Sequence, residues 1–376
     1  MSVENETPSR VLLVRVDFGE GEMEARLAEI SELAQSAGYQ VVESLTPRRV
    51  KPDAALFVGR GKAEEIAERC RAHEINGVIF DHTLSGVQQR NLRKLLSCSV
   101  EDRIGLILTI FAQRARSAEG KLQVELARLK HQATLLVGGW THLERQKGGI
   151  GLRGGPGETQ LEVDRRLITA RIKHLNAQLE KLKKTRQTQS RTRARARIKT
   201  VALVGYTNAG KTTLFNRLTR EKLYVADQLF ATLDTTLRRL PIAHAQPMVV
   251  SDTVGFIREL PHELVMAFHA TLSEAVEADL LLHVIDASSP ARDEQITAVD
   301  AVLTEINATR QPRIRVFNKI DQTGLAAGIE RDGYGRIRTV RLSAQNGAGC
   351  DVLREALAEY FPKSEPDAVA PLEQPL

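Results

Sequence analysis

This chain of 376 residues has few cysteines, no long apolar run and no apolar stretch at its start. The three cysteines, Cys70, Cys98 and Cys350, show no CxxC spacing, which excludes a disulfide scaffold and a zinc ribbon and fits a reducing cytosol. No stretch approaches the roughly 18 consecutive apolar residues that a membrane span needs. The first ten residues are polar and lack the apolar core of a secretory signal. We therefore expect a cytoplasmic protein with no membrane span. We also expect a monomer.

The overall composition is that of a folded protein. Apolar residues make up 42% and charged residues 27% of the chain, which is ordinary for a soluble globular protein and excludes disorder throughout. At roughly 150 residues per domain, the length predicts two or three domains.

Positive charge is concentrated in one segment. Residues 171–199 hold eleven Lys or Arg and one Glu, a local net charge of +10, whereas the whole chain carries only +6. The rest of the chain is therefore slightly acidic. Such a basic stripe is typical of a polyanionic partner, most often nucleic acid. A solvated helix face without a partner is the alternative.

The first 112 residues predict a small α/β domain, because short apolar runs alternate with amphipathic stretches. The predicted strands are 11–16, 39–42, 54–58 and 77–80. The predicted helices are 22–37, 63–73 and 87–96, with a further helix-prone stretch at 104–116.

Residues 113–198 predict an antiparallel helical hairpin. Two series of apolar residues recur at the three-, four- and seven-residue spacing of a helical packing seam. They are Leu122, Leu126, Leu129, Ala133 and Leu136, and then Leu161, Ile168, Ile172, Leu175, Leu179 and Leu182. Between the two lies Gly148–Gly157, in which six of ten residues are glycine. Glycine lets a backbone approach a ligand closely, so we expect this loop either to contact nucleic acid or to serve as a flexible linker.

A second α/β domain is predicted over 199–363, followed by a flexible tail, rich in proline and acid, at 364–376. Its predicted strands are 200–204, 248–251, 280–286, 313–318 and 339–343. Its predicted helices include 212–218, 291–306 and 352–360.

The start of this domain carries a phosphate-binding loop. The pattern G-x-x-x-x-G-K-[ST] is formed by Gly205, Tyr206, Thr207, Asn208, Ala209, Gly210, Lys211 and Thr212. It follows a predicted strand and precedes a predicted helix, which is the context this motif requires. Backbone N–H groups and the helix N-terminus would hold phosphates, Lys211 would add charge, and the Thr212 hydroxyl would bind Mg²⁺.

A second phosphate-side motif follows a strand and begins 41 residues after Lys211. It consists of Asp252, Thr253, Val254 and Gly255. An acid at a strand end can hold Mg²⁺ through water, and the N–H of a mobile glycine can sense a γ-phosphate.

Two further motifs predict recognition of guanine. They are Asn318, Lys319, Ile320 and Asp321, and then Ser343, Ala344 and Gln345, each after a predicted strand. The Asp321 carboxylate can accept two hydrogen bonds from the guanine edge, whereas adenine would leave it unpaired. Asn318 can brace the loops, the Lys319 stem can pack on the base, and the last loop can donate a backbone N–H.

In this order, the four motifs resemble the translation-factor class of P-loop GTPases. The resemblance implies a Ras-like doubly wound domain that hydrolyses GTP with Mg²⁺. It places the first switch at Phe230, Ala231, Thr232, Leu233 and Asp234. Thr232 would complete the shell of Mg²⁺ beside Thr212 and Asp252, with Thr235 and Thr236 as alternatives. Lys211, Thr232 and Gly255 would then form the catalytic set.

Three features together are similar to the HflX family. The basic helical segment precedes the GTPase domain, the string GGIGLRGGPGETQLEVDRR lies within it, and the switch reads FATLDTT. This resemblance extends over nearly the whole chain. It implies binding to the large ribosomal subunit, with Gly148–Gly157 near its RNA, and the splitting or rescue of stalled ribosomes. Thr235 stands where the family often has proline, and we expect the extra C-terminal domain of longer members to be absent.

Two residues bear on how GTP is hydrolysed. Phe256 stands where many GTPases have a glutamine that orients the attacking water, so we expect slow hydrolysis until another group completes the site. Asn208 occupies the P-loop position whose side-chain oxygen helps to hold K⁺ in some GTPases, and K⁺ would supply transition-state charge.

Two other functions remain open at this point. One is a GTPase that matures ribosomal or transfer RNA. The other is an RNA-remodelling module whose N-terminal domain acts independently, with ATP as a further ligand.

Overall fold

The computed structural model describes residues 9–19, 21–137, 160–221, 229–259, 261, 264 and 269–363. The chain divides into two compact units. The first unit comprises Met1–Lys183, Gln228–Leu233 and Pro261–Phe268, and the second comprises the remainder. The glycine-rich stretch Gly148–Gly157 and the tail 364–376 lie outside the described residues.

The first unit is built on a four-stranded parallel sheet in the order β2-β1-β3-β4. The strands are β1 (Arg10–Val14), β2 (Gln40–Leu45), β3 (Gly77–Phe80) and β4 (Ser99–Asp102). The helices that alternate with them are α1 (Met23–Ser36), α2 (Arg60–Ala72), α3 (Gly86–Leu96) and α4 (Arg103–Arg114). The central strands β1 and β3 are buried along almost their whole length, as expected for a parallel sheet covered on both faces.

One predicted strand of this unit is wrong. Residues 54–58 form a turn, because the Asp53 carboxylate accepts hydrogen bonds from the N–H groups of Ala55 and Leu56 at 2.9 and 2.8 Å. Phe57 then adopts a left-handed conformation with φ of 62°. Local side-chain hydrogen bonds of this kind compete with strand formation, even in an apolar run. The structure instead adds β4, a strand that the sequence pattern did not reveal.

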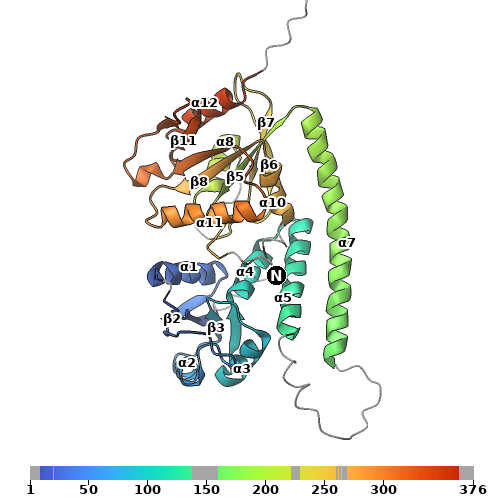
Figure 1. Ribbon diagram of the computed structural model, residues 1–376, viewed down its shortest axis with the longest axis vertical. Helices are drawn as coiled ribbons and strands as arrows, with labels where there is room; N and C mark the ends of the chain where they lie inside the picture. Colours follow the sequence, from blue (N-terminus) through green and yellow to red (C-terminus); the bar gives the residue numbers. More distant parts are fainter. Residues whose placement is uncertain are drawn as a thin grey trace, which may run out of the picture. The chain divides into compact units, whose positions relative to one another are not determined.

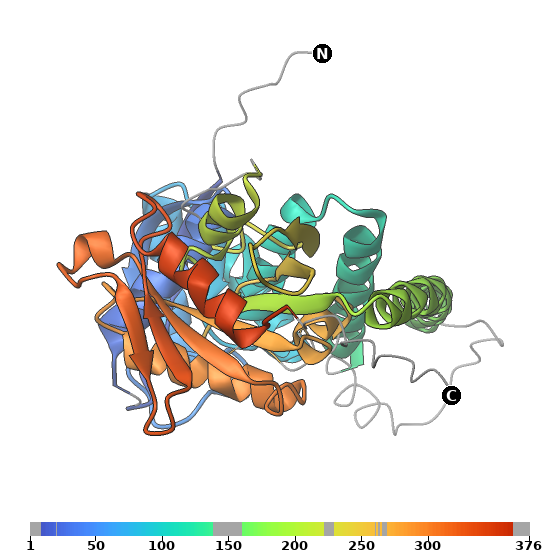
Figure 2. The same ribbon diagram turned by 90° about the horizontal axis from the view of Figure 1, so that it is seen from above.

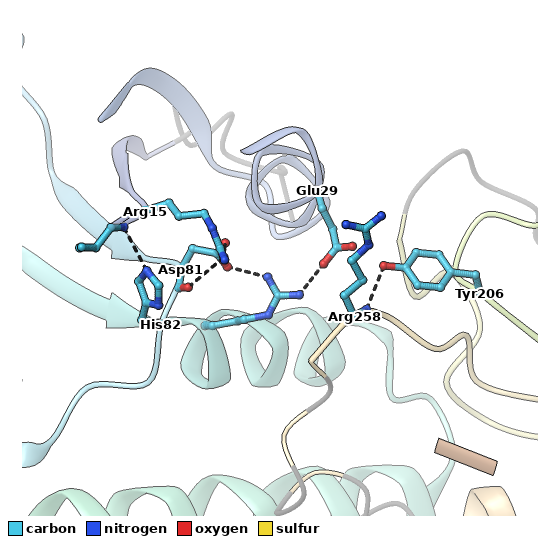
Figure 3. Close-up of polar contacts among 8 residues, drawn as sticks. Arg15, Glu29, Asp81, His82, Tyr206 and Arg258 are labelled. Atoms are coloured by element: carbon cyan, nitrogen blue, oxygen red, sulfur yellow. Dashed lines mark hydrogen bonds and ion pairs between the residues drawn. The ribbon is translucent and has the colours of Figure 1, made fainter. Parts of the chain in front are cut away.

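A buried ion network joins the carboxyl ends of β1 and β3 in the first unit. Asp81 accepts from Arg15 and from Arg103, each at 2.5 Å, and Arg103 also pairs with Glu29 (Figure 3). Burial opposes the charge on Arg103, but Asp81 and Glu29 outweigh this effect and raise its pKa. His82 Nε2 accepts from the N–H of Val16 at 3.0 Å beside this network.

Two helices form the predicted antiparallel hairpin. They are α5 (Ala118–Val137) and α7 (Gln160–Arg195), which lie side by side in Figure 1. Arg171 of α7 pairs with Glu125 of α5 at 2.7 Å. Farther along α5, Leu135 and Leu136 share a cleft with Asp164 and Leu167 of α7, so the two helices run in opposite directions. Leu126 and Leu175, both predicted seam residues, are buried.

The second unit is built on a seven-stranded sheet in the order β10-β11-β9-β8-β5-β7-β6. The two outermost strands, β6 and β10, run antiparallel to their neighbours, and the five inner strands are parallel. The strands are β5 (Lys199–Gly205), β6 (Thr236–Leu240), β7 (Met248–Asp252), β8 (Leu280–Asp286), β9 (Arg313–Asn318), β10 (Gly328–Arg331) and β11 (Ile337–Arg341). The helices are α8 (Lys211–Thr219), α10 (His269–Val276), α11 (Arg292–Glu305) and α12 (Cys350–Tyr360), with a 3-10 turn at Ile320–Gln322.

Helices cover both faces of this second sheet. Figures 1 and 2 show α8 and α12 over one face and α11 over the other. One core cluster joins Phe215 of α8 and Leu353 of α12 to Leu203, Leu282 and Val316 of the sheet. This is the predicted doubly wound arrangement, and it brings the carboxyl ends of β5, β7, β8 and β9 to one edge. No helix in the described parts of the chain combines the length and apolar character needed to cross a membrane.

Candidate functional site

The predicted phosphate loop connects β5 to α8 in the second unit. Gly205 has φ of 153°, and a Cβ there would lie 2.2 Å from the carbonyl oxygen of Val284. Gly210 has φ of 89°, and its Cβ would lie 2.3 Å from Nδ2 of Asn318. Both positions therefore require glycine, since any side chain would push neighbouring strands or loops apart. The loop ends at Lys211, the first residue of α8, so that the helix N-terminus faces the loop.

Lys211 is held inside this loop. Its Nζ donates to the carbonyl oxygens of Gly205 at 3.0 Å and Tyr206 at 2.7 Å. Burial lowers the pKa of Lys211 to about 8, and the charge of Asp252 opposes that effect only in part. Because little water surrounds this buried ammonium, its electrostatic attraction for an anion in the loop is strong.

Thr212 and Asp252 lie together at the adjoining strand ends. The Thr212 hydroxyl donates to Asp252 Oδ2 at 2.8 Å, and Asp252 is fully buried at the end of β7. A hydroxyl and a carboxylate oxygen are ligands that Mg²⁺ prefers, with phosphate oxygens and water completing its shell. These two residues therefore fit the predicted metal. Thr236, one of the alternative switch threonines, is the register partner of Asp252 on β6.

The Gly255 segment is tied to the phosphate loop. Thr207 N–H donates to the Phe256 carbonyl at 2.7 Å, and Phe256 N–H donates to the Gly205 carbonyl at 3.1 Å. A Cβ on Gly255 would lie 2.7 Å from Cγ2 of Thr207 and 3.1 Å from Nζ of Lys211. The structure therefore brings the predicted γ-phosphate sensor beside the predicted phosphate-binding lysine. The Phe256 side chain is buried.

Two neighbouring contacts support this arrangement. The Tyr206 hydroxyl accepts a hydrogen bond from the N–H of Arg258 at 2.9 Å (Figure 3). The Thr253 hydroxyl donates to the Leu203 carbonyl of β5 at 2.6 Å, so this threonine fixes its own strand end rather than facing the loop.

Asn318 connects the phosphate side of the site to the predicted guanine side. Its Nδ2 donates to the Ala209 carbonyl at 2.9 Å, and its Oδ1 accepts from the N–H of Ala344 at 2.9 Å. Asn318 is 2% exposed, so both hydrogen bonds are shielded from water. One side chain at the end of β9 thus braces two loops that are far apart in the sequence.

The other guanine-side residues surround this brace. Lys319 has φ of 62°, and its Nζ pairs with Asp286 at 2.6 Å, which holds its stem across the end of β8. Asp321 is exposed in the 3-10 turn, and within the described residues no hydrogen bond holds its carboxylate. Ser343 is buried, and its hydroxyl accepts from Asn346 N–H at 3.3 Å. The turn therefore presents Asp321 outward beside a rigid frame.

The sequence analysis missed Arg217 as a residue of the site. From α8, this guanidinium donates to the carbonyl oxygens of Ala344, at 3.2 Å, and Gln345. It therefore holds the second guanine-side loop from the helix that follows the phosphate loop. No sequence signal marks it, because a basic residue on an amphipathic helix is ordinary and its partners are more than a hundred positions away.

The predicted first switch is divided between the two units. Leu229, Phe230 and Leu233 are buried and belong to the first unit. The Phe230 ring meets Phe111 of α4 edge-on at 4.7 Å between centroids, and Leu229 N–H donates to the Ser36 hydroxyl at 3.1 Å. Ala231 and Thr232 are half-buried in the same segment, whereas Asp234 belongs to the second unit.

Part of the basic stripe is paired with acid. Arg193 lies 3.5 Å from Glu274, and the Ser190 hydroxyl donates to Glu277 at 2.8 Å. Other cations of α7 are exposed. They include Lys183, Lys184, Arg191 and Arg195.

Three family models match consecutive parts of this chain. They are described as GTP-binding GTPase N-terminal, over residues 24–112, GTP-binding GTPase Middle Region, over 114–193, and 50S ribosome-binding GTPase, over 200–319. A structure of SsGBP in complex with GDP is 26% identical, with a TM-score of 0.51, and the match covers 94% of this chain and 98% of that one.

Curated relatives are similar over nearly the whole chain. The GTPase HflX of Escherichia coli K12 is 54% identical, over 93% of this chain and 82% of the relative. The GTPase HflX of Caldanaerobacter subterraneus subsp. tengcongensis is 47% identical, over 95% and 82%. The predicted family, fold class and GTPase activity are confirmed. The chain is a GTP hydrolase and belongs to the HflX family of 50S ribosome-binding GTPases.

Proposed function

We propose that this GTPase binds the large ribosomal subunit in its GTP form and acts there to split or rescue stalled ribosomes, hydrolysis accompanying its release. The observation that carries the proposal is that residues 200–319 match the family model described as 50S ribosome-binding GTPase, in a chain whose preceding segments match the N-terminal and middle models of GTP-binding GTPases. The exposed cations of α7 supply the charge that an RNA surface would attract.

Individual residues of the predicted nucleotide site support specific roles in GTP hydrolysis. Lys211 binds the β- and γ-phosphates from within the loop, and the Gly255 N–H detects the γ-phosphate. Thr212 and Asp252 would hold Mg²⁺, with Thr232 added from the first switch. Bound Mg²⁺ supplies positive charge to the phosphate oxygens.

The residues at the guanine end have roles in binding the base. Asp321 accepts from the guanine edge, Lys319 packs along the base, and the Ala344–Gln345 backbone lines the other side, held by Asn318 and Arg217. Asn318 ends β9 and the Ala344–Gln345 loop follows β11, the neighbouring parallel strand, which supports these roles.

Water activation is the step for which Phe256 provides no group. The Phe256 side chain is buried and has no hydrogen-bonding atom, so it cannot orient the attacking water. A ribosomal element, a switch backbone group or K⁺ held with Asn208 would complete the site. Turnover in KCl against NaCl at equal ionic strength tests the last of these, since equal rates would remove K⁺ from the proposal.

The decisive experiment measures GTP hydrolysis with and without purified large subunits, together with separation of intact ribosomes into subunits. We expect subunits to raise turnover at least about tenfold, which corresponds to about 1.4 kcal/mol of transition-state stabilisation. Lys211→Ala should abolish both turnover and separation. Cosedimentation with transfer RNA in preference to ribosomal subunits would favour an RNA-maturation GTPase instead.

The charge on α7 is tested separately. Arg191→Gln with Arg195→Gln should weaken ribosome binding and flatten its dependence on salt concentration, because fewer counterions are released. Arg60→Gln on the surface of α2 removes an exposed charge outside the stripe and serves as the control. A salt response that is unchanged by the double substitution would make the stripe a solvated face.

A further inference from the structure

Two of the three cysteines lie against each other in the first unit. Cys70 belongs to α2 and is 4% exposed within the apolar cluster that also contains Ile66, Val78 and Val100. Cys98 follows α3 and is half-buried, and it packs against the same cluster. Their thiols are hydrogen-bonded to each other. Both are reduced in this structure.

The backbone on either side holds this thiol pair in place. Beyond the end of α2, the Ile75 N–H donates back to the Cys70 carbonyl at 2.9 Å. Ser99, next to Cys98, donates both its N–H and its hydroxyl to the Asn76 carbonyl, at 3.1 and 3.0 Å. The segment Ile75–Asn76 is therefore hydrogen-bonded to the end of α2 at Cys70 and to the start of β4 at Ser99. These hydrogen bonds fix the backbone close to both thiols.

The two thiols differ in access and in chemistry. Cys98 is the one that a small solute can reach, and the hydrogen bond from Cys70 lowers its pKa, although burial opposes this. That same hydrogen bond, followed by burial, raises the pKa of Cys70. A thiolate is the reactive form of cysteine, so the exposed member of the pair is also the better nucleophile.

The remaining cysteine provides an internal comparison. Cys350 is buried at the start of α12 in the second unit, and its Sγ lies 3.8 Å from the Ser343 carbonyl. Burial raises its pKa. It has neither the exposure of Cys98 nor a neighbouring thiol among the described residues.

We propose that Cys70 and Cys98 form a reversible redox site in which a peroxide converts the thiol pair into a disulfide. The Cys98 thiolate attacks one oxygen of hydrogen peroxide, the O–O bond breaks, and Cys98 becomes a sulfenic acid. The other oxygen leaves as hydroxide and becomes water with the proton that the Cys98 thiol released. The Cys70 sulfur then attacks the Cys98 sulfur, the S–O bond breaks, and the sulfenic oxygen leaves as water with the proton from Cys70. Cys98 thus acts as the attacking thiol and Cys70 as the resolving thiol.

A disulfide at this position would join the end of α2 to the turn between α3 and β4. Such a crosslink lowers the conformational entropy of the unfolded chain, so it should stabilise the first unit against unfolding. Reduction by a dithiol returns both cysteines to thiols and removes the added stability. The site is separate from the nucleotide site, and its chemistry does not depend on GTP.

The test treats the full-length protein with hydrogen peroxide at near-stoichiometric amounts, alkylates the remaining thiols, and maps the cysteine peptides by mass spectrometry. We expect a linked peptide that contains Cys70 and Cys98 and has lost two hydrogens, and we expect dithiothreitol to reverse it. Cys350 should react at least roughly tenfold more slowly, since it is buried and its pKa is raised. The oxidised protein should unfold at a higher temperature than the reduced protein.

Two variants separate the roles of the thiols. In Cys98→Ser, Cys70 should remain a free thiol under the same treatment. In Cys70→Ala, Cys98 should stop at the sulfenic acid, which dimedone traps. The proposal is overturned if the wild-type protein accumulates dimedone-trapped Cys98 without the linked peptide, or if Cys350 is oxidised first. Because Cys98 is half-buried at a turn, its serine variant keeps the test valid even if Cys70→Ala folds poorly.

Discussion

The side-chain amide of Asn318 donates a hydrogen bond to the backbone carbonyl oxygen of Ala209 at 2.9 Å, across 109 positions of sequence. Through its oxygen, the same amide accepts from Ala344. The predicted phosphate loop and the predicted base-side loop are therefore fixed to one group at the end of β9. A ligand that needs both loops in register benefits from this brace before it arrives, since preorganisation lowers the cost of binding.

Replacing this brace should weaken nucleotide binding. Asn318→Ala leaves a buried carbonyl and a buried N–H without their partners, at about 1–3 kcal/mol for each unsatisfied group. We expect GDP affinity to fall by roughly 10- to 100-fold, measured by titration calorimetry. Asn307→Gly, at the exposed end of α11, is the matched control and should bind GDP normally. Unchanged affinity in Asn318→Ala would show that the two loops need no brace.

Proton uptake should accompany nucleotide binding at alkaline pH. Burial lowers the pKa of Lys211 to about 8, so about half of the molecules carry a neutral amine at pH 8. A phosphate beside the amine favours the charged form, and binding should therefore take up roughly half a proton at that pH. Calorimetry at pH 8 in two buffers with different ionisation enthalpies measures this number.

The matched variant for that measurement is Lys211→Met, which keeps the length of the side chain without its amine. Its residual binding should show no proton uptake at pH 8. If the wild-type protein takes up no proton there, the buried amine is already fully charged and the predicted lowering of its pKa is wrong.

The Asp321 carboxylate should decide which base is bound. In Asp321→Asn, one oxygen that would accept from guanine becomes an NH₂ donor, which faces the guanine amino group and cannot bond with it. The loss of charge-assisted hydrogen bonds, about 1.5–3 kcal/mol each, should lower GDP affinity by at least roughly 10-fold. Xanthosine diphosphate carries an acceptor at that position and should bind the variant better than GDP does.

Asp351→Asn removes a carboxylate from the exposed first turn of α12 and is the control for this experiment. It should retain the preference for GDP. Guanine discrimination that survives in Asp321→Asn would place recognition of the base elsewhere in the site.

Sequence reasoning succeeded where one local pattern determines the outcome. Strands Gly77–Phe80, Leu280–Asp286 and Arg313–Asn318 were predicted to the residue, because each is an apolar or alternating run bounded by turn residues. It failed at β4 (Ser99–Asp102) and β6 (Thr236–Leu240), which are short and carry charged residues. Pairing with neighbouring strands, which no local pattern encodes, makes these two segments strands.

In the candidate site, too, residues that belong to local motifs were predictable and residues that depend on long-range contacts were not. The order of its motifs along the chain predicted that the phosphate loop, Asp252 and Asn318 lie at strand ends, and the structure has them at the ends of β5, β7 and β9, while their roles in binding stay predictions. Arg217 and the contact between Phe230 and Phe111 were not predictable, because both depend on packing between distant segments. A side chain whose role depends on long-range contacts leaves no spacing signal in a single sequence.

His283 should make the stability of the second unit depend on pH. It lies within β8, and burial lowers its pKa to about 4, with Arg313, Arg315 and Lys211 acting in the same direction and Asp300 against it. The unfolded chain gains a proton as pH falls through about 6.5, whereas the folded state resists protonation until about pH 4. Stability associated with the neutral imidazole is therefore present above about pH 6.5 and is lost between about 6.5 and 4. Between pH 7 and pH 5, the loss should be about 2 kcal/mol.

Urea unfolding of the full chain at pH 7 and pH 5 measures this loss, and the comparison with His283→Gln isolates it from the contributions of other groups. The variant is less stable at pH 7, because glutamine does not fill the buried site as well, but it should lose about 2 kcal/mol less on acidification. His244→Gln changes an exposed histidine of the same unit and should keep the wild-type response. If His283→Gln loses as much stability as the wild-type protein, the imidazole is already protonated in the folded state at pH 5. A buried cation inside β8 would then need a partner, and Asp300 on α11 is the acid that acts on this imidazole.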